Sequence, residues 1–133
     1  MKYINKKLTI ENVKVQNIAK KFGTPAYCYS YNQLKKNINN FKKSFKSFSP
    51  LICFAIKSNT NVNLISEIRK LGLGADVVSV GELMKALKAG IKPNKIVFSG
   101  VGKTVEEIKY AINKKILLIN AESKSEIFEI ERI

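Results

Sequence analysis

The chain has 133 residues, 45% of them hydrophobic, and a formal net charge of +14. This length and apolar content predict a packed globular fold rather than a disordered tail. No apolar run approaches the roughly 20 residues of a membrane span, and the N-terminus lacks the apolar stretch of a secretory signal, so we expect a cytoplasmic protein without a membrane partner.

The basic charge comes almost entirely from lysine, with 22 Lys against two Arg, Arg69 and Arg132. Proteins that read nucleic acids rely on arginine forks, and these lysines are spread along the chain. Lys, Ile and Asn together supply 52 of the 133 residues, a pattern expected from A/T-rich codon use. The composition therefore predicts a solvated lysine-rich surface and no nucleic-acid partner.

The N-terminal part contains three predicted elements. Residues 13–22 have helical spacing and end at Gly23, and residues 25–30 form an aromatic run typical of a strand. Residues 32–48 predict a long basic helix with one apolar stripe, which we expect to pack in a core rather than to bind a cofactor. The members of this stripe are Leu34, Ile38, Phe41, Phe45 and Phe48.

Four short apolar runs follow, at residues 51–56, 75–80, 95–99 and 116–119, and an amphipathic stretch comes after each. Strands that are buried on both faces have such continuous apolar runs. The expected helix starts are Asn61, Gly81 and Thr104, and the expected stops are Gly72, Gly90 and Asn113. Repeated strand–helix units of this length predict a parallel sheet, in either an open sheet or a (β/α)8 barrel.

Side-chain parity in the first of these strands favours the barrel. Cys53, Ala55 and Lys57 share one face and are small or functional, whereas the bulky residues at 52, 54 and 56 share the other, as packing against an outer ring of helices requires. A (β/α)8 barrel needs about 200 residues or more. We therefore expect an α/β chain that forms the N-terminal half of a barrel and is a fragment of a longer protein.

Lys57 is the first candidate for chemistry. It follows a buried strand, where an unpaired ammonium costs several kcal/mol and tends to lose its proton. A neutral amine is what Schiff-base chemistry requires. With 22 lysines in the chain, its position at the carboxyl end of a strand carries the argument.

Other polar residues near strand ends remain open between a structural and a functional role. Asp76 is the only aspartate and opens the second strand, so it is either a strand-start or capping residue or a partner for a group held by Lys57. Glu82 suits the positive end of a helix. Ser79 and Ser99 lie at strand ends and are equally open to both interpretations.

Two glycine-containing stretches were compared with phosphate-binding loops and do not fit them. Residues 100–104, Gly-Val-Gly-Lys-Thr, have the tail of a Walker A loop, but position 97, where its first glycine belongs, is valine. Residues 72–77 begin like a dinucleotide fingerprint but precede a strand instead of following one. Cys28 and Cys53 favour two buried reduced thiols over a disulfide or reactive pair, and the absence of histidine argues against a metal site.

Four segments taken together resemble one enzyme family in order and spacing. They are Thr24–Ser30, Cys53–Asn59, Gly74–Leu83 and Phe98–Thr104. The chain resembles the amino-terminal part of the alanine-racemase-like, pyridoxal-phosphate-dependent decarboxylases, with Ile119–Ser123 pointing to their diaminopimelate branch. The resemblance extends from about Tyr3 to Ile133.

The resemblance implies a role for each candidate residue. Lys57 would bind pyridoxal 5'-phosphate covalently, Ala55 would be the small residue under the cofactor, and Asp76 would lie beside it. Ser79 and Glu82 would support the site from the second strand. The family's ring-stacking histidine, glycine-rich phosphate loop, ring-nitrogen carboxylate and carboxy-terminal β-domain have no counterpart in these residues, so we expect the fragment alone to be inactive.

The resemblance also implies an activity and an assembly for the full-length protein. Residues 1–30 would contribute to a second, β-domain, and residues 31–133 would form the first half of the cofactor-binding barrel. The expected reaction is decarboxylation of meso-2,6-diaminopimelate to L-lysine, the last step of lysine biosynthesis, by a homodimer. The alternatives are a related decarboxylase of ornithine, arginine or carboxynorspermidine, a non-catalytic cofactor carrier, or a basic binding module without activity.

Overall fold

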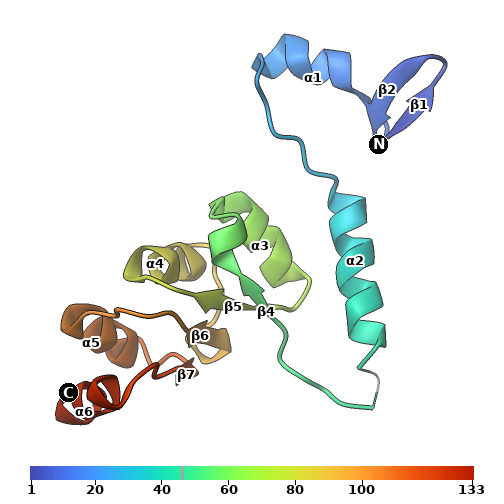
Figure 1. The fold of residues 1–133 in the computed structure, drawn as a ribbon. Coiled ribbons are helices and arrows are strands. Elements are labelled where there is room, and N and C mark those ends of the chain that lie inside the picture. The colour runs from blue at the N-terminus through green and yellow to red at the C-terminus, as the bar shows by residue number, and fades with distance from the viewer. Residues whose placement is uncertain (46) are drawn as a thin grey trace. The chain divides into compact units, whose positions relative to one another are not determined.

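The computed structural model describes residues 1–45 and 47–133. The chain divides into two compact units, Met1–Ser49 and Pro50–Ile133 (Figure 1). The first unit starts with a three-stranded antiparallel sheet of β1 (Lys2–Ile4), β2 (Lys7–Ile10) and β3 (Val13–Lys14), followed by helices α1 (Val15–Phe22) and α2 (Tyr31–Lys43).

The sheet of the first unit was not predicted from the sequence. Asn5 and Lys6 both have positive φ, 47° and 60°, and connect β1 to β2 as a two-residue hairpin turn. Val13 pairs with Ile10 of β2, so α1 begins two residues later than the helical spacing predicts. Gly23, with φ of 80°, ends α1 as predicted.

Two further predictions for this unit are wrong. Residues 25–30 form no strand, because within the described residues no other strand pairs with them. Helix α2 is capped by Ser30 and ends at Lys43 instead of reaching residue 48. Its apolar stripe is not buried in the described chain, where Phe41 is 53% exposed and Phe48 is 73% exposed.

The second unit is a four-stranded parallel sheet with helices between its strands. The strands are β4 (Cys53–Ala55), β5 (Gly74–Val77), β6 (Ile96–Phe98) and β7 (Leu118–Ile119). The helices are α3 (Val62–Lys70), α4 (Val80–Lys88), α5 (Val105–Asn113) and α6 (Lys124–Arg132), with short 3-10 turns η1 (Ile56–Ser58) and η2 (Pro93–Lys95). The strand order is β4-β5-β6-β7, without the reversal of a doubly wound sheet, so the predicted α/β half-barrel is confirmed.

The core of this unit lies between one face of the sheet and the helices. Ala75 and Val77 of β5 and Ile96 and Phe98 of β6 are fully buried, and they pack in one cluster with residues of η1, α3, α4 and α5. Consecutive helices from α3 to α6 contact each other along this face (Figure 1). Burying a side chain of this size stabilises the fold by roughly 1.5–3 kcal/mol, so this face fixes the register of the strands.

The helix ends follow local signals. Asn61 and Thr104 cap α3 and α5 as predicted, and Gly72 and Gly90, with φ of 86° and 84°, follow the ends of α3 and α4. Helix α4 begins earlier than predicted, because the hydroxyl of Ser79 accepts the hydrogen bond that starts it. Among the residues that the structure describes, no helix is long and apolar enough to cross a lipid bilayer.

Candidate active site

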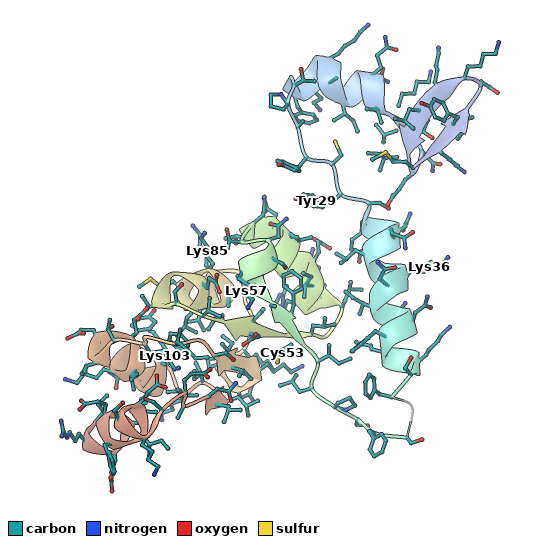
Figure 2. The ribbon with its side chains drawn as sticks, viewed as in Figure 1. Tyr29, Lys36, Cys53, Lys57, Lys85 and Lys103 are labelled. Atoms are coloured by element: carbon teal, nitrogen blue, oxygen red, sulfur yellow. The ribbon has the colours of Figure 1, made fainter. Side chains whose placement is uncertain are left out.

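Lys57 lies just beyond the carboxyl end of β4, in the 3-10 turn η1 (Figure 2). Ile56 is completely buried and anchors this turn, while Ser58 Oγ donates to the backbone oxygen of Ala55 at 2.8 Å. Lys57 therefore lies at the carboxyl end of a strand as predicted, but the strand ends at Ala55, so the alternation of faces that grouped Lys57 with Cys53 and Ala55 does not extend to it. Its side chain is also exposed in the described chain, so burial does not supply the desolvation that the sequence argument used.

Asp76 lies on the neighbouring strand β5, in register with Ala55 of β4, and β5 also contacts η1. Its carboxylate is half-buried and accepts a hydrogen bond on Oδ1 from Ser99 Oγ, at 2.7 Å. Ser99 Oγ in turn accepts a hydrogen bond from Asn120 Nδ2, at 2.9 Å. Strands β5, β6 and β7 thus place Asp76, Ser99 and Asn120 in one hydrogen-bonded chain, which we call the Asp76 network.

The Asp76 network lies at the edge of the sheet where Lys57 also lies. In a parallel sheet the carboxyl ends of all strands meet at one edge, where sites of barrel enzymes are built. Ser99 and Asn120 are the residues that directly follow β6 and β7. Ser99 was left open between a structural and a functional role on the sequence alone, and Asn120 was not predicted as a site residue. The position of Asn120 directly after an apolar run is the feature that could have indicated it.

Ser79 and Glu82 are held together at the start of α4. Ser79 Oγ accepts a hydrogen bond from the backbone N–H of Glu82 at 3.3 Å, and Glu82 Oε2 accepts one from the backbone N–H of Val78 at 3.0 Å. Ser79 therefore caps the helix, and Glu82 accepts from an N–H group of the residue just before the cap. The support that the family resemblance assigns to them at the site stays a prediction.

Glu107 is a capping carboxylate that was not predicted from the sequence. One of its oxygens accepts from the backbone N–H of Val80 at 2.9 Å, and the other from that of Thr104 at 3.1 Å. These hydrogen bonds, that from Val80 first, lower the pKa of Glu107. The Thr-x-x-Glu signature of a capping box was readable in the sequence, but the link to α4 was not.

Lys103 lies in the glycine-containing stretch that follows β6 (Figure 2), and its side chain is buried. Only 1% of its side chain is exposed, and Nζ lies 2.8 Å from Glu126 Oε1 of α6 and donates to the backbone oxygen of Gly100 at 2.6 Å. Burial alone would raise the pKa of Glu126, but the Glu122 N–H and the Lys103 ammonium lower it overall. The ammonium group of this lysine is therefore held in an ion pair.

Cys53 and Gly74 pair in register on β4 and β5 and share a face of the sheet with Ala55 and Asp76. Both cysteines of the chain are free. Burial, and secondly the charge of Asp76, raise the pKa of the Cys53 thiol, so it stays protonated near neutral pH. Residue 55 is small, as the resemblance requires.

These residues fit an aldehyde cofactor that carries a ring. Lys57 offers an accessible amine at the strand end, Ala55 has a small side chain, and Asp76 presents an anchored carboxylate on the next strand. An amine that binds a carbonyl beside an acidic group is the donor set that Schiff-base cofactors use.

Comparison with known proteins decides the family. A family model described as "Pyridoxal-dependent decarboxylase, pyridoxal binding domain" matches residues 31–133. The chain belongs to the pyridoxal-dependent decarboxylases. Diaminopimelate decarboxylase from Helicobacter pylori is 49% identical over 84% of this chain, and that from Aquifex aeolicus is 43% identical over all of it.

Solved structures of pyridoxal-dependent decarboxylases share the fold. The crystal structure of Helicobacter pylori diaminopimelate decarboxylase complexed with L-lysine superposes with a TM-score of 0.85 and 44% identity, over 90% of this chain and 30% of that one. The chain spans 28% and 31% of the length of the two curated relatives. Residues 31–133 therefore correspond to part of the pyridoxal-binding domain of such a decarboxylase.

Proposed function

We propose that the full-length protein decarboxylates meso-2,6-diaminopimelate to L-lysine with pyridoxal 5'-phosphate, as the last step of lysine biosynthesis. One observation carries this proposal: the relatives with identities of 49% and 43% over 84% and 100% of the chain are both named diaminopimelate decarboxylases. The structure of the Helicobacter pylori enzyme with L-lysine supports the product class.

In this proposal Lys57 binds the aldehyde carbon of the cofactor through its Nζ. Its exposed side chain on the short turn η1 leaves the amine accessible, while the buried Ile56 fixes the backbone beneath it. When bound, pyridoxal phosphate supplies the electron sink that accepts the electron pair released as carbon dioxide leaves.

The neighbouring strand supplies charge and orientation. Asp76 holds a negative charge on β5 in register with Ala55, where it favours positive charge on a bound amine or ring. Ser79 and Glu82 fix the start of α4, directly after β5, and through it the end of that strand. In this proposal these side chains bind and orient the cofactor, and the cofactor itself accepts the electron pair.

The experiment that tests this function uses the full-length protein loaded with pyridoxal phosphate. We expect an absorbance band near the visible edge that borohydride removes, with the reduced label on the peptide that contains Lys57. Lys57→Ala should abolish the band and lower turnover by several orders of magnitude. Lys57→Arg should fail equally, because arginine stays protonated and cannot bind the aldehyde. Lys85→Ala, at an exposed lysine of α4, is the matched control.

Substrate choice is tested in the same preparation. Carbon dioxide release from meso-diaminopimelate should exceed that from ornithine, arginine or carboxynorspermidine. A preference for one of these three would instead identify the alternative decarboxylase, and a loaded protein that releases carbon dioxide from none would be a cofactor carrier. A borohydride-reducible band at another lysine, with normal turnover of the Lys57→Ala variant, would contradict the role of Lys57.

Assembly and location are part of the proposal. We infer a homodimer in the cytoplasm from the family resemblance alone. Light scattering of the full-length protein should give twice the mass of one chain. A monomer with full activity would contradict the dimer.

A further inference from the structure

Asp76 has a single anchor in the described part of the chain. The hydrogen bond from Ser99 Oγ engages Oδ1, and no hydrogen bond or ion pair among the described residues engages Oδ2. A carboxylate held by one oxygen can rotate about its terminal bond unless its donor is itself fixed. What fixes Ser99 therefore decides where Oδ2 points.

The backbones of both donor residues are fixed by the sheet. The N–H of Ser99 donates to the backbone oxygen of Val77 at 2.8 Å, and the N–H of Asn120 donates to that of Phe98 at 2.9 Å. Both bonds continue the parallel ladder one residue beyond the strands. The fully buried Val77 and Phe98 anchor the strand ends to the core.

The number of available hydrogens determines which group donates and which accepts in each hydrogen bond of the Asp76 network. Ser99 has one hydroxyl hydrogen, and the Asp76 carboxylate can only accept, so that hydrogen goes to Oδ1. The Ser99 oxygen is then left as an acceptor, and the Asn120 amide must present its NH2 group to it. Each bond polarises the next, which strengthens the chain of bonds toward the carboxylate.

We propose that Ser99 and Asn120 are positioning residues that hold the Asp76 carboxylate by Oδ1 and keep Oδ2 available to a ligand bound at Lys57. This inference rests on the proposed function, because the ligand is the cofactor of that reaction. Neither residue needs to touch the cofactor. Their effect reaches it through Asp76 alone.

Two substitutions break the Asp76 network in different ways. Ser99→Ala removes the donor to Asp76, and Ser99→Thr keeps it. Asn120→Asp preserves the shape of the side chain but replaces the donor by an acceptor, which competes for the Ser99 hydrogen and places a second negative charge beside Asp76. Asn113→Asp makes the same charge change at an exposed residue at the far end of α5.

The experiment measures three quantities on the full-length protein: the dissociation constant for pyridoxal phosphate of the cofactor-free form, the visible circular dichroism of the loaded form, and the melting temperature of the cofactor-free form. A hydrogen bond to a charged group is worth about tenfold or more in an equilibrium constant. We expect about tenfold weaker binding and an altered circular dichroism band for Ser99→Ala, with a larger effect for Asn120→Asp. Ser99→Thr and Asn113→Asp should stay within about twofold of the unaltered protein.

The outcomes separate this inference from the proposed function. If the unaltered protein binds no pyridoxal phosphate, both are overturned. If it binds but Ser99→Ala and Asn120→Asp change only the melting temperature, the residues are structural and this inference alone fails. If Asn120→Asp does not fold, Ser99→Ala against Ser99→Thr still decides the matter by the dissociation constant and the dichroism band.

Discussion

The buried ion pair between Lys103 and Glu126 gives the sharpest prediction about stability. Lys103→Met keeps most of the apolar stem but removes the ammonium group, whose Nζ lies 5.9 Å from the centroid of the Phe98 ring. Glu126 is then left nearly buried, with only 10% of its side chain exposed, and without its cation. Removing one partner of a buried pair typically costs about 3–5 kcal/mol. Because the Glu122 N–H still donates to Glu126, at 2.6 Å, we expect the lower end, about 3 kcal/mol.

Urea unfolding of the full-length protein at neutral pH, followed by circular dichroism, measures this cost. Lys85→Met is the matched control, because Lys85 is exposed and a surface change usually shifts stability by less than about 0.5 kcal/mol. In the Glu126→Gln variant, the destabilisation caused by Lys103→Met should be smaller by about 2 kcal/mol, because no carboxylate at position 126 is left without its cation. Equal costs for Lys103→Met and Lys85→Met, or no coupling to Glu126, would refute the reasoning.

The same pair predicts a pH dependence. The pKa of Glu126 in the folded protein is lowered from its usual value of 4.5, although burial alone would raise it, so folding favours the ionised form. Its contribution to stability is present above pH 4.5 and is lost as the pH falls through the lower folded pKa. The difference in the free energy of unfolding between the unaltered protein and the Glu126→Gln variant should therefore decrease over this acidic range. A difference in unfolding free energy that stays constant below pH 4.5 would contradict the lowered pKa of Glu126.

Three other features give predictions of their own. Gly74→Ala should destabilise the protein by about 1–3 kcal/mol, because a Cβ at this position collides with the backbone oxygen of Lys95. Gly81→Ala is the control: its Cβ meets only the Ser79 hydroxyl at 3.8 Å, so thermal melts should show a neutral or stabilising effect. Glu107→Gln should cost about 2 kcal/mol in urea unfolding, because an amide cannot accept at both ends, while Glu106→Gln at the exposed neighbour should cost little. Binding to duplex DNA should be weak and lost at physiological salt in fluorescence anisotropy, and tight site-specific binding there would contradict the solvated-surface interpretation.

Local signals account for the parts of the fold that the sequence predicted. The caps at Asn61 and Thr104 and the positive-φ stop at Gly72 act within a few residues, so they can be read without knowing the fold. The β1–β2 hairpin was missed because its turn, Asn5-Lys6, contains no glycine and so lacks the usual signature. Residues 25–30 have high β-propensity, but propensity does not supply a partner strand.

The candidate site was predictable in residue type more than in geometry. The position of Lys57 after a strand was predicted correctly, but the apolar Ile56 led to a predicted strand that extends one residue beyond the end of β4. Ile56 is buried in a 3-10 turn, where burial does not imply alternation between two faces. The Asp76 network could not be read from the sequence, because it depends on the register of β5, β6 and β7.

The serine positions show what physically separates a cap from a site residue in this fold. Only residues 78 and 79 lie between β5 and α4, so Ser79 must start the helix and its hydroxyl is used by the Glu82 N–H. Residues 99–104 lie between β6 and α5, so Thr104 serves as the cap and Ser99 remains at the strand end. A hydroxyl directly after a strand, with no helix N–H within reach, is free to bond across the sheet, as Ser99 does to Asp76. The length of the loop after each of these two strands therefore assigns the serine near the strand end either to a helix cap or to the carboxyl edge of the sheet, where the proposed site lies.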